Sequence, residues 1–218
     1  HPCVTIRSII NRGGEQGAQH SQALHAWFAH VPGLRVVMPS TVADARDLLI
    51  ASVLCNDPVM YIDDRWLYDQ EDDLPPVVEL DLATQRPVVS ITGGDITIVA
   101  SGHSSLLARE AAQQLKSNGV SAEVVDVRVL NPFYTEIIID SVKKTKSLLV
   151  VDSGWLSGGF SAEIIAKVVE QLPVNYLDNA PVRVALPDAP APTSRVLEKA
   201  YYTSTNNVVE AVKKILKK

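Results

Sequence analysis

The sequence has little of several features that mark whole classes of protein. No apolar run approaches the ~20 residues that would cross a bilayer, so no membrane role is expected. The formal net charge is −5. Its one basic cluster, lysines at 213, 214, 217 and 218, lies in the last turn of a predicted helix, where cations complement the helix dipole. A nucleic-acid partner is therefore not expected, because such proteins usually carry a basic stripe.

Common catalytic and metal-binding spacings are also missing. The two cysteines, Cys3 and Cys55, form no CxxC pair and no metal spacing with histidine, which favours buried thiols in a reducing compartment. No Ser-His-Asp or zinc pattern appears. The glycines Gly13, Gly14 and Gly17 fit neither a GxGxxG motif nor a P-loop.

The composition is that of an ordinary globular protein of 218 residues, with 46% apolar and 21% charged residues. Strand-like and helix-like segments alternate, which predicts an α/β fold with largely parallel sheets covered on both faces. An acidic run followed by Leu74-Pro75-Pro76 interrupts the alternation. We therefore expect an irregular connector over Asp69–Gln85 between two separate sheets.

The predicted elements follow hydrophobic periodicity. In the first half they are strands at Val4–Ile10 (buried), Arg35–Met38 and Val59–Ile62, and helices at Ser21–His30 and Thr41–Leu54. In the second half they are strands at Asp95–Ala100, Ala122–Asp126, Ser147–Val151 and Val182–Val184, and helices at Ser104–Lys116, Thr135–Thr145, Ser161–Leu172 and Thr205–Leu216.

Position alone marks His20 as a candidate proton-transfer residue. It lies at a strand-to-helix junction, and ligands bind at the carboxyl edge of parallel sheets. An ordinary surface or core histidine is the commoner outcome. Two loops, Ser101–Ser105 and Ser153–Gly159, could hold a phosphate or carboxylate at a helix start. A tight turn with a serine cap is the interpretation that we favour for both.

Several segments carry a family resemblance that runs over nearly the whole chain. They are Gly17-Ala18-Gln19-His20-Ser21-Gln22, Trp27-Phe28-Ala29-His30-Val31-Pro32-Gly33-Leu34, Val124-Val125-Asp126-Val127-Arg128, Gly159-Phe160-Ser161-Ala162-Glu163 and Asp188-Ala189-Pro190-Ala191-Pro192. In this order they resemble the beta subunit of thiamin-diphosphate-dependent 2-oxo-acid dehydrogenases of the pyruvate and branched-chain type, within the transketolase-like superfamily.

The resemblance implies a domain arrangement. Residues 1–73 would form the second half of a pyrimidine-binding domain, 74–90 a connector, and 91–218 a transketolase C-terminal-like three-layer α/β domain. The first half of the pyrimidine-binding domain, with the glutamate that bonds the cofactor, would lie outside this sequence. We therefore expect the chain to be too short for a whole active site.

The resemblance also implies site residues. His20 matches the histidine that donates protons to the 2-oxo acid or its thiamin adduct. A potassium ion would be held by backbone carbonyls around Ser52, Val53, Cys55 and Asp57, although Cys55 replaces a usual acidic residue. Asp178 matches an aspartate that helps to bind the acyltransferase core, although the extra Asn179 departs from the pattern.

The implied activity is decarboxylation of a 2-oxo acid on thiamin diphosphate, followed by acyl transfer to a lipoyl group. The implied partners are the alpha subunit, which holds the diphosphate and its magnesium, the lipoyl acyltransferase core, and further beta subunits. The expected location is the cytoplasm, or the mitochondrial matrix in a eukaryote. Two alternatives stay open: another transketolase-like enzyme, such as transketolase or deoxyxylulose-phosphate synthase, and a non-catalytic assembly or docking module.

Overall fold

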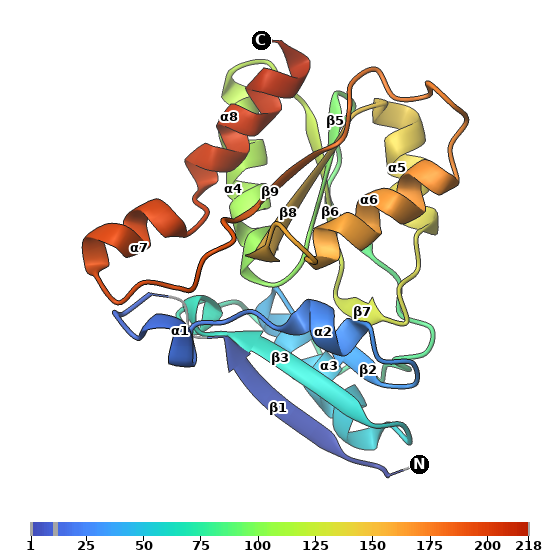
Figure 1. The fold of residues 1–218 in the computed structure, drawn as a ribbon. Coiled ribbons are helices and arrows are strands. Elements are labelled where there is room, and N and C mark those ends of the chain that lie inside the picture. The colour runs from blue at the N-terminus through green and yellow to red at the C-terminus, as the bar shows by residue number, and fades with distance from the viewer. Residues whose placement is uncertain (1, 11–12, 218) are drawn as a thin grey trace.

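The computed structural model describes residues 2–10 and 13–217 and arranges them around two β-sheets (Figure 1). The first sheet has the strand order β1-β3-β2-β7. Its strands are β1 (Thr5–Ile10), β2 (Arg35–Val37), β3 (Val59–Asp64) and β7 (Val129–Asn131). The first three are parallel, and β7 joins β2 antiparallel although it comes from the second half of the chain.

The second sheet has five strands in the order β4-β6-β5-β8-β9. They are β4 (Val88–Ile91), β5 (Ile96–Ala100), β6 (Ala122–Asp126), β8 (Leu148–Trp155) and β9 (Val182–Leu186). All neighbours are parallel except β4 with β6. Every residue of β5 and β6 is buried, as expected for central strands covered on both faces.

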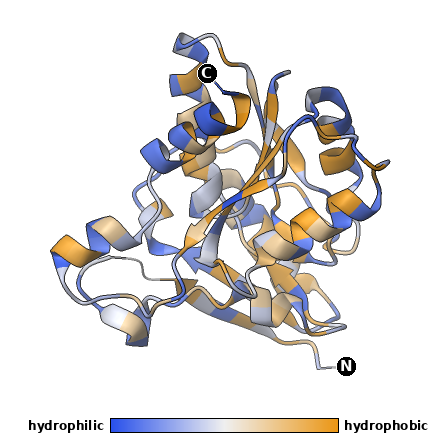
Figure 2. Cartoon of the chain, turned by 45° about the horizontal axis from the view of Figure 1, so that its top comes forward, coloured by the Kyte–Doolittle hydropathy of each residue, from blue (hydrophilic) through white to orange (hydrophobic). Residues whose placement is uncertain are grey.

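Helices form the outer layers of this second sheet. Side chains of α4 (His103–Ser117) and α8 (Thr205–Leu216) pack against one face. Those of α5 (Glu136–Thr145) and α6 (Phe160–Glu170) pack against the other. The strands are largely hydrophobic and the helices alternate hydrophobic and hydrophilic residues (Figure 2). The predicted α/β class with a three-layer second half is therefore confirmed.

One hydrophobic cluster joins the two sheets. It contains Val36 and Met60 from the first sheet together with Val99 and Val150 from the second. The opposite face of the first sheet packs against α3 (Val42–Leu54). A 3-10 turn, η1 (Arg65–Leu67), leads from β3 into the connector. The connector is irregular as predicted, yet its Leu82 is buried against the first sheet.

The predicted single helix Ser21–His30 is wrong, because the structure has two short helices there. These are α1 (Gly17–His20) and α2 (His25–Ala29). Between them the chain buries Ser21, Ala23 and His25 together. Residues two apart point to opposite sides of an α-helix, so one continuous helix would have turned Ala23 away from the side that holds the other two. The helix is therefore interrupted between His20 and His25, because this allows Ser21, Ala23 and His25 to be buried together.

The expectation of a buried first strand is also wrong. Strand β1 lies at the edge of its sheet, and Ile6 and Ile9 are 50% and 44% exposed. The cysteines differ from expectation as well: Cys3 is exposed and Cys55 is half-buried, and both are free thiols. The Cys3 thiol donates a hydrogen bond to the carbonyl of Asn56. Within the described chain, no helix combines the length and the apolar character that a bilayer crossing requires.

The exposed edge strand leads to a prediction about association. We expect the chain to self-associate at micromolar concentration through β1, because an unpaired strand edge with exposed apolar side chains attracts other chains. Sedimentation velocity over a concentration series measures this. Ile6→Lys should weaken association, and Val174→Lys, at a loop position that is 92% exposed, should leave it unchanged. A wild-type monomer over the whole series would contradict the prediction.

Candidate functional site

The carboxyl ends of the two parallel sheets meet each other. Met38, which follows β2, accepts a hydrogen bond at its sulfur from Ser101, which follows β5. A Cβ placed on Gly102 would lie 2.6 Å from the Met38 methyl carbon. The edge at which α/β proteins usually bind ligands is therefore partly closed by contact between the two halves.

His20 lies on the surface of the protein. It is the last residue of α1, and its side chain is exposed. It does not line any of the five principal cavities formed by the described residues. The structure therefore places His20 where a second subunit or a substrate from solvent could reach it.

A second histidine of the same segment is fully buried. His25, the first residue of α2, is 0% exposed, and its Nε2 lies 2.8 Å from Oδ1 of Asp152 in β8. The carboxylate of Asp152 also accepts hydrogen bonds from the backbone amides of Gly154 and Ser161, at 2.9 and 2.7 Å. Burial alone would raise the pKa of Asp152. The charge and hydrogen bond of His25 and the two amides outweigh it and lower that pKa to about 2.

Asp126, at the end of β6, is a buried carboxylate whose pKa is shifted in the opposite direction, upward. Ser105 donates to its Oδ1 at 2.7 Å, and Ser40 from the first half donates to its Oδ2. Arg109 donates to both the hydroxyl and the carbonyl of Ser40. Burial raises the pKa of Asp126, and the two hydroxyls and the Arg109 charge offset only part of that effect. This cluster joins the halves by buried polar contacts.

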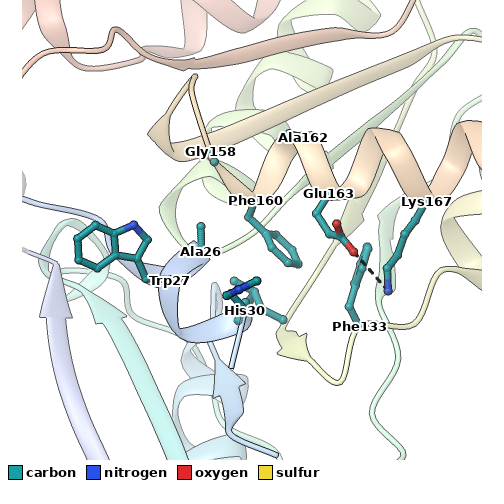
Figure 3. A pocket seen from close by; sticks show the side chains of 12 residues that line it. Ala26, Trp27, His30, Phe133, Gly158, Phe160, Ala162, Glu163 and Lys167 are labelled. Atoms are coloured by element: carbon teal, nitrogen blue, oxygen red, sulfur yellow. Dashed lines mark ion pairs between the residues drawn. The ribbon is translucent and has the colours of Figure 1, made fainter. Parts of the chain in front are cut away.

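A cavity of about 600 Å³ lies between α2 and α6 (Figure 3). Phe133 and Phe160 form its apolar wall, with ring centroids 5.2 Å apart in an edge-to-face arrangement. Glu163 and Lys167 form an ion pair of 3.5 Å beside it. Trp27 lies apart at one side and is 70% exposed. The cavity has the aromatic wall of a ligand pocket, and its two oppositely charged side chains pair with each other.

A cavity of about 500 Å³ lies between the loop after β1, η1, α4 and α7 (Arg195–Tyr201). Its aromatic wall is Trp66, edge-to-face with His103 and with Tyr202. Gly13 approaches this wall closely, because a Cβ there would lie 3.0 Å from the Trp66 ring. The glycine-rich loop therefore packs against an aromatic side chain.

The predicted potassium segment is a turn at the end of α3. The Ser52 carbonyl accepts from the Thr5 hydroxyl at 2.7 Å, and the Asp57 carboxylate accepts two hydrogen bonds from Arg35. Cys55 and Asp57 line a cavity of about 300 Å³ that Glu79 and Asp81 of the connector also line. A carbonyl oxygen keeps a second lone pair after one hydrogen bond, so this arrangement is compatible with a cation and the site stays a prediction.

Asp178 is exposed in the loop between α6 and β9, and its backbone amide donates to the carbonyl of Lys146 at 2.9 Å. It is accessible to a partner, and its role stays a prediction. The described residues hold no group of three or more His, Cys, Asp or Glu side chains suited to a metal ion. The expectation that this chain alone does not bind thiamin diphosphate and magnesium stays a prediction.

Sequence reasoning missed the His25–Asp152 pair. From the sequence, His25 has no assigned role and is only placed within the predicted helix Ser21–His30, and the loop Ser153–Gly159 is interpreted as a tight turn with a serine cap. The structure shows that this loop does surround a carboxylate at a helix start, but the carboxylate belongs to the chain itself. The signal available was an aspartate at the end of an apolar strand, directly before a glycine-rich helix entry.

Comparison with known families accounts for both halves. Residues 1–70 match the transketolase pyrimidine-binding domain, and residues 87–208 match the transketolase C-terminal domain. The chain belongs to the transketolase family. A solved structure titled split gene transketolase, inactive beta4 tetramer, agrees with a TM-score of 0.79 at 25% identity, covering 98% of this chain and 66% of that one.

Relatives within the transketolase family confirm the resemblance found in the sequence. The pyruvate dehydrogenase E1 component subunit beta of Rhizobium meliloti is 36% identical over 97% of this chain, and the mitochondrial one of Caenorhabditis elegans is 39% identical over 98%. The beta subunit of an acetoin:2,6-dichlorophenolindophenol oxidoreductase of Bacillus subtilis is 32% identical over 98%. The chain covers 46%, 61% and 62% of these relatives, so it spans between about half and two-thirds of their length.

Proposed function

We propose that this chain is part of the beta subunit of a thiamin-diphosphate-dependent 2-oxo-acid dehydrogenase. In the assembled enzyme the 2-oxo acid is decarboxylated on the cofactor and the acyl group passes to a lipoyl arm. The observation that carries the proposal is the identity of 36–39% with pyruvate dehydrogenase beta subunits across 97–98% of the chain, through both transketolase-family domains. We propose domain boundaries of 1–73 and 91–218, with β7 of the second domain completing the first sheet.

In this proposal His20 supplies a proton to the substrate or its adduct at a junction between subunits. Its exposed position at the end of α1 supports that role, because a group that completes a shared site has to be accessible from outside its own chain. The alpha subunit supplies the diphosphate and magnesium side, Asp178 contacts the acyltransferase core, and the turn around Ser52 and Asp57 holds potassium. The proposed compartment is the cytoplasm or the mitochondrial matrix.

A non-catalytic assembly module is the second candidate. The similarity to a split transketolase whose title describes an inactive tetramer favours it for the chain by itself. The module would supply subunit contacts through β1 and docking through Asp178.

Reconstitution separates these candidates. The beta subunit of which this chain is proposed to be part is mixed with the alpha subunit, thiamin diphosphate and magnesium, and carbon dioxide release is measured with pyruvate and with a branched-chain 2-oxo acid. Release that depends on both subunits supports the proposed dehydrogenase. A stable complex without release supports the assembly module. Dye reduction with acetoin, without release from either 2-oxo acid, supports an activity like that of the Bacillus relative.

The isolated chain is expected not to bind the cofactor. His20 alone offers one hydrogen bond, worth ~0.5–1.5 kcal/mol net, whereas micromolar affinity needs about 8 kcal/mol. Titration calorimetry with thiamin diphosphate and magnesium measures this, and the assembled alpha and beta subunits are the positive control. Saturable micromolar binding to the chain alone would contradict the prediction, because it would require a complete site on one chain.

A further inference from the structure

The His25–Asp152 contact joins parts of the chain that are 127 residues apart. Both side chains are buried, His25 at 0% and Asp152 at 3% exposure. Because Asp152 is ionised through the neutral range, with a pKa of about 2, its Oδ1 accepts and the Nε2–H of His25 donates. A hydrogen bond to a buried charged acceptor is among the stronger single contacts in a protein.

The end of β8 and the loop after it are shaped around this pair. A Cβ on Gly154 would lie 3.3 Å from the Asp152 carboxylate and 3.3 Å from the His25 ring, tighter than ordinary packing. A Cβ on Gly159 would lie 2.2 Å from the Trp155 carbonyl and 3.1 Å from the Asp152 carboxylate. Asp152 also accepts from the amide of Ser161 in the first turn of α6, where the helix dipole favours an anion. The acceptor side of the contact is therefore rigid.

The donor side belongs to a segment with little structure of its own. Helices α1 and α2 have four and five residues, and helices of that length are not stable without tertiary contacts. His20 ends α1, five residues before His25. At its start, α1 lies close to Thr193, because a Cβ on Gly17 would come within 2.5 Å of the Thr193 methyl group. The position of His20 at the other end of α1 also depends on what holds α2 against the rest of the molecule.

We propose that His25 and Asp152 are positioning residues for His20: the buried pair fixes α2 to the carboxyl end of β8 and so sets where the α1 histidine lies. The catalytic consequence rests on the proposed function of His20. The positioning itself rests only on the geometry of the pair.

Amide hydrogen exchange of the full chain, followed by mass spectrometry of peptides covering residues 17–30, tests the positioning. His25→Leu keeps an apolar side chain but loses the donor, and Asp152→Asn loses the charge. Both are expected to speed exchange in this segment about tenfold or more, as loss of a charge-assisted hydrogen bond implies. His25→Gln keeps an amide nitrogen near the place of Nε2 and should stay within about threefold of wild type. His30→Leu, an exposed histidine of the same segment, is the matched control.

The comparison between Gln and Leu separates positioning from packing. Equal protection in the two His25 variants would overturn the proposal, and so would faster exchange that is uniform over α4 and α8. If His25→Leu does not fold, the comparison of His25→Gln with Asp152→Asn decides. The proposal is overturned if residues 17–30 keep their protection from amide exchange in both variants, or lose it in both.

Activity in the reconstituted enzyme gives a second readout. His25→Leu is expected to lower kcat about tenfold with little change in KM, and His25→Gln should restore most of it, because misplacement of a catalytic group affects the chemical step. If the wild-type enzyme has no activity, the proposed function fails, while the exchange experiment still decides the positioning. A Leu variant with wild-type kcat would overturn the link to His20.

Discussion

Lowering the pH from 5 to 2 is expected to remove on the order of 2 kcal/mol of folding free energy that depends on Asp152. The folded-state pKa of this carboxyl is about 2, below its ordinary value of 3.8. A carboxyl with a depressed folded pKa stabilises the folded state above its unfolded pKa, and the contribution is lost as the pH falls toward the folded pKa. A difference of about 2 pKa units corresponds to about 2–3 kcal/mol.

Urea unfolding of wild type and Asp152→Asn at a series of pH values measures this contribution. The difference between the two free energies of unfolding should be near 2 kcal/mol at pH 6 and should shrink toward pH 2. Because both proteins contain Asp126, taking the difference cancels the contribution of that residue to the free energy of unfolding. The raised pKa of Asp126 gives that contribution a pH dependence of opposite sign. Asp188→Asn is the control. Hydrogen bonds from Ser157 lower the pKa of Asp188, but this exposed carboxyl is screened by water. A pH-independent difference would contradict the assignment.

The sequence was sufficient for the central elements of the fold. Ala122–Asp126 was predicted with the bounds that β6 has, and Thr205–Leu216 with those of α8. These segments are either wholly buried or strongly amphipathic, so their hydrophobic pattern is set by local structure. The connector was also predictable, because proline and acidic residues disfavour both helix and strand.

Elements that depend on distant pairing were not predictable. Strands β4 and β7, of four and three residues, were missed, and β7 exists through its pairing with β2 of the other sheet. The break between α1 and α2 was missed for the same reason, because it places His25 against Asp152. No local pattern encodes a partner 127 residues away.

The candidate site likewise has features that the sequence identifies and features that only the three-dimensional structure shows. Family motifs identified His20 and its segment, and the structure adds that this histidine is exposed while its neighbour His25 is buried. The potassium turn and Asp178 were assigned by motif alone. Their geometry is compatible with the assignment, but ion and partner contacts involve atoms outside this chain. The buried polar contacts between the two halves required the three-dimensional arrangement.

Replacing His20 by alanine is expected to lower kcat of the reconstituted dehydrogenase by about 10²–10⁴-fold, the usual contribution of a positioned proton donor. Stability should change by no more than about 0.5 kcal/mol, because the side chain is exposed. Decarboxylation kinetics and urea unfolding, measured on the same preparations, separate the two effects. His30→Ala, at an exposed histidine of the same segment, should keep wild-type kcat. If His20→Ala stays within about threefold of wild type, proton donation must come from another group, and the exposed position of His20 then favours a role in subunit contact.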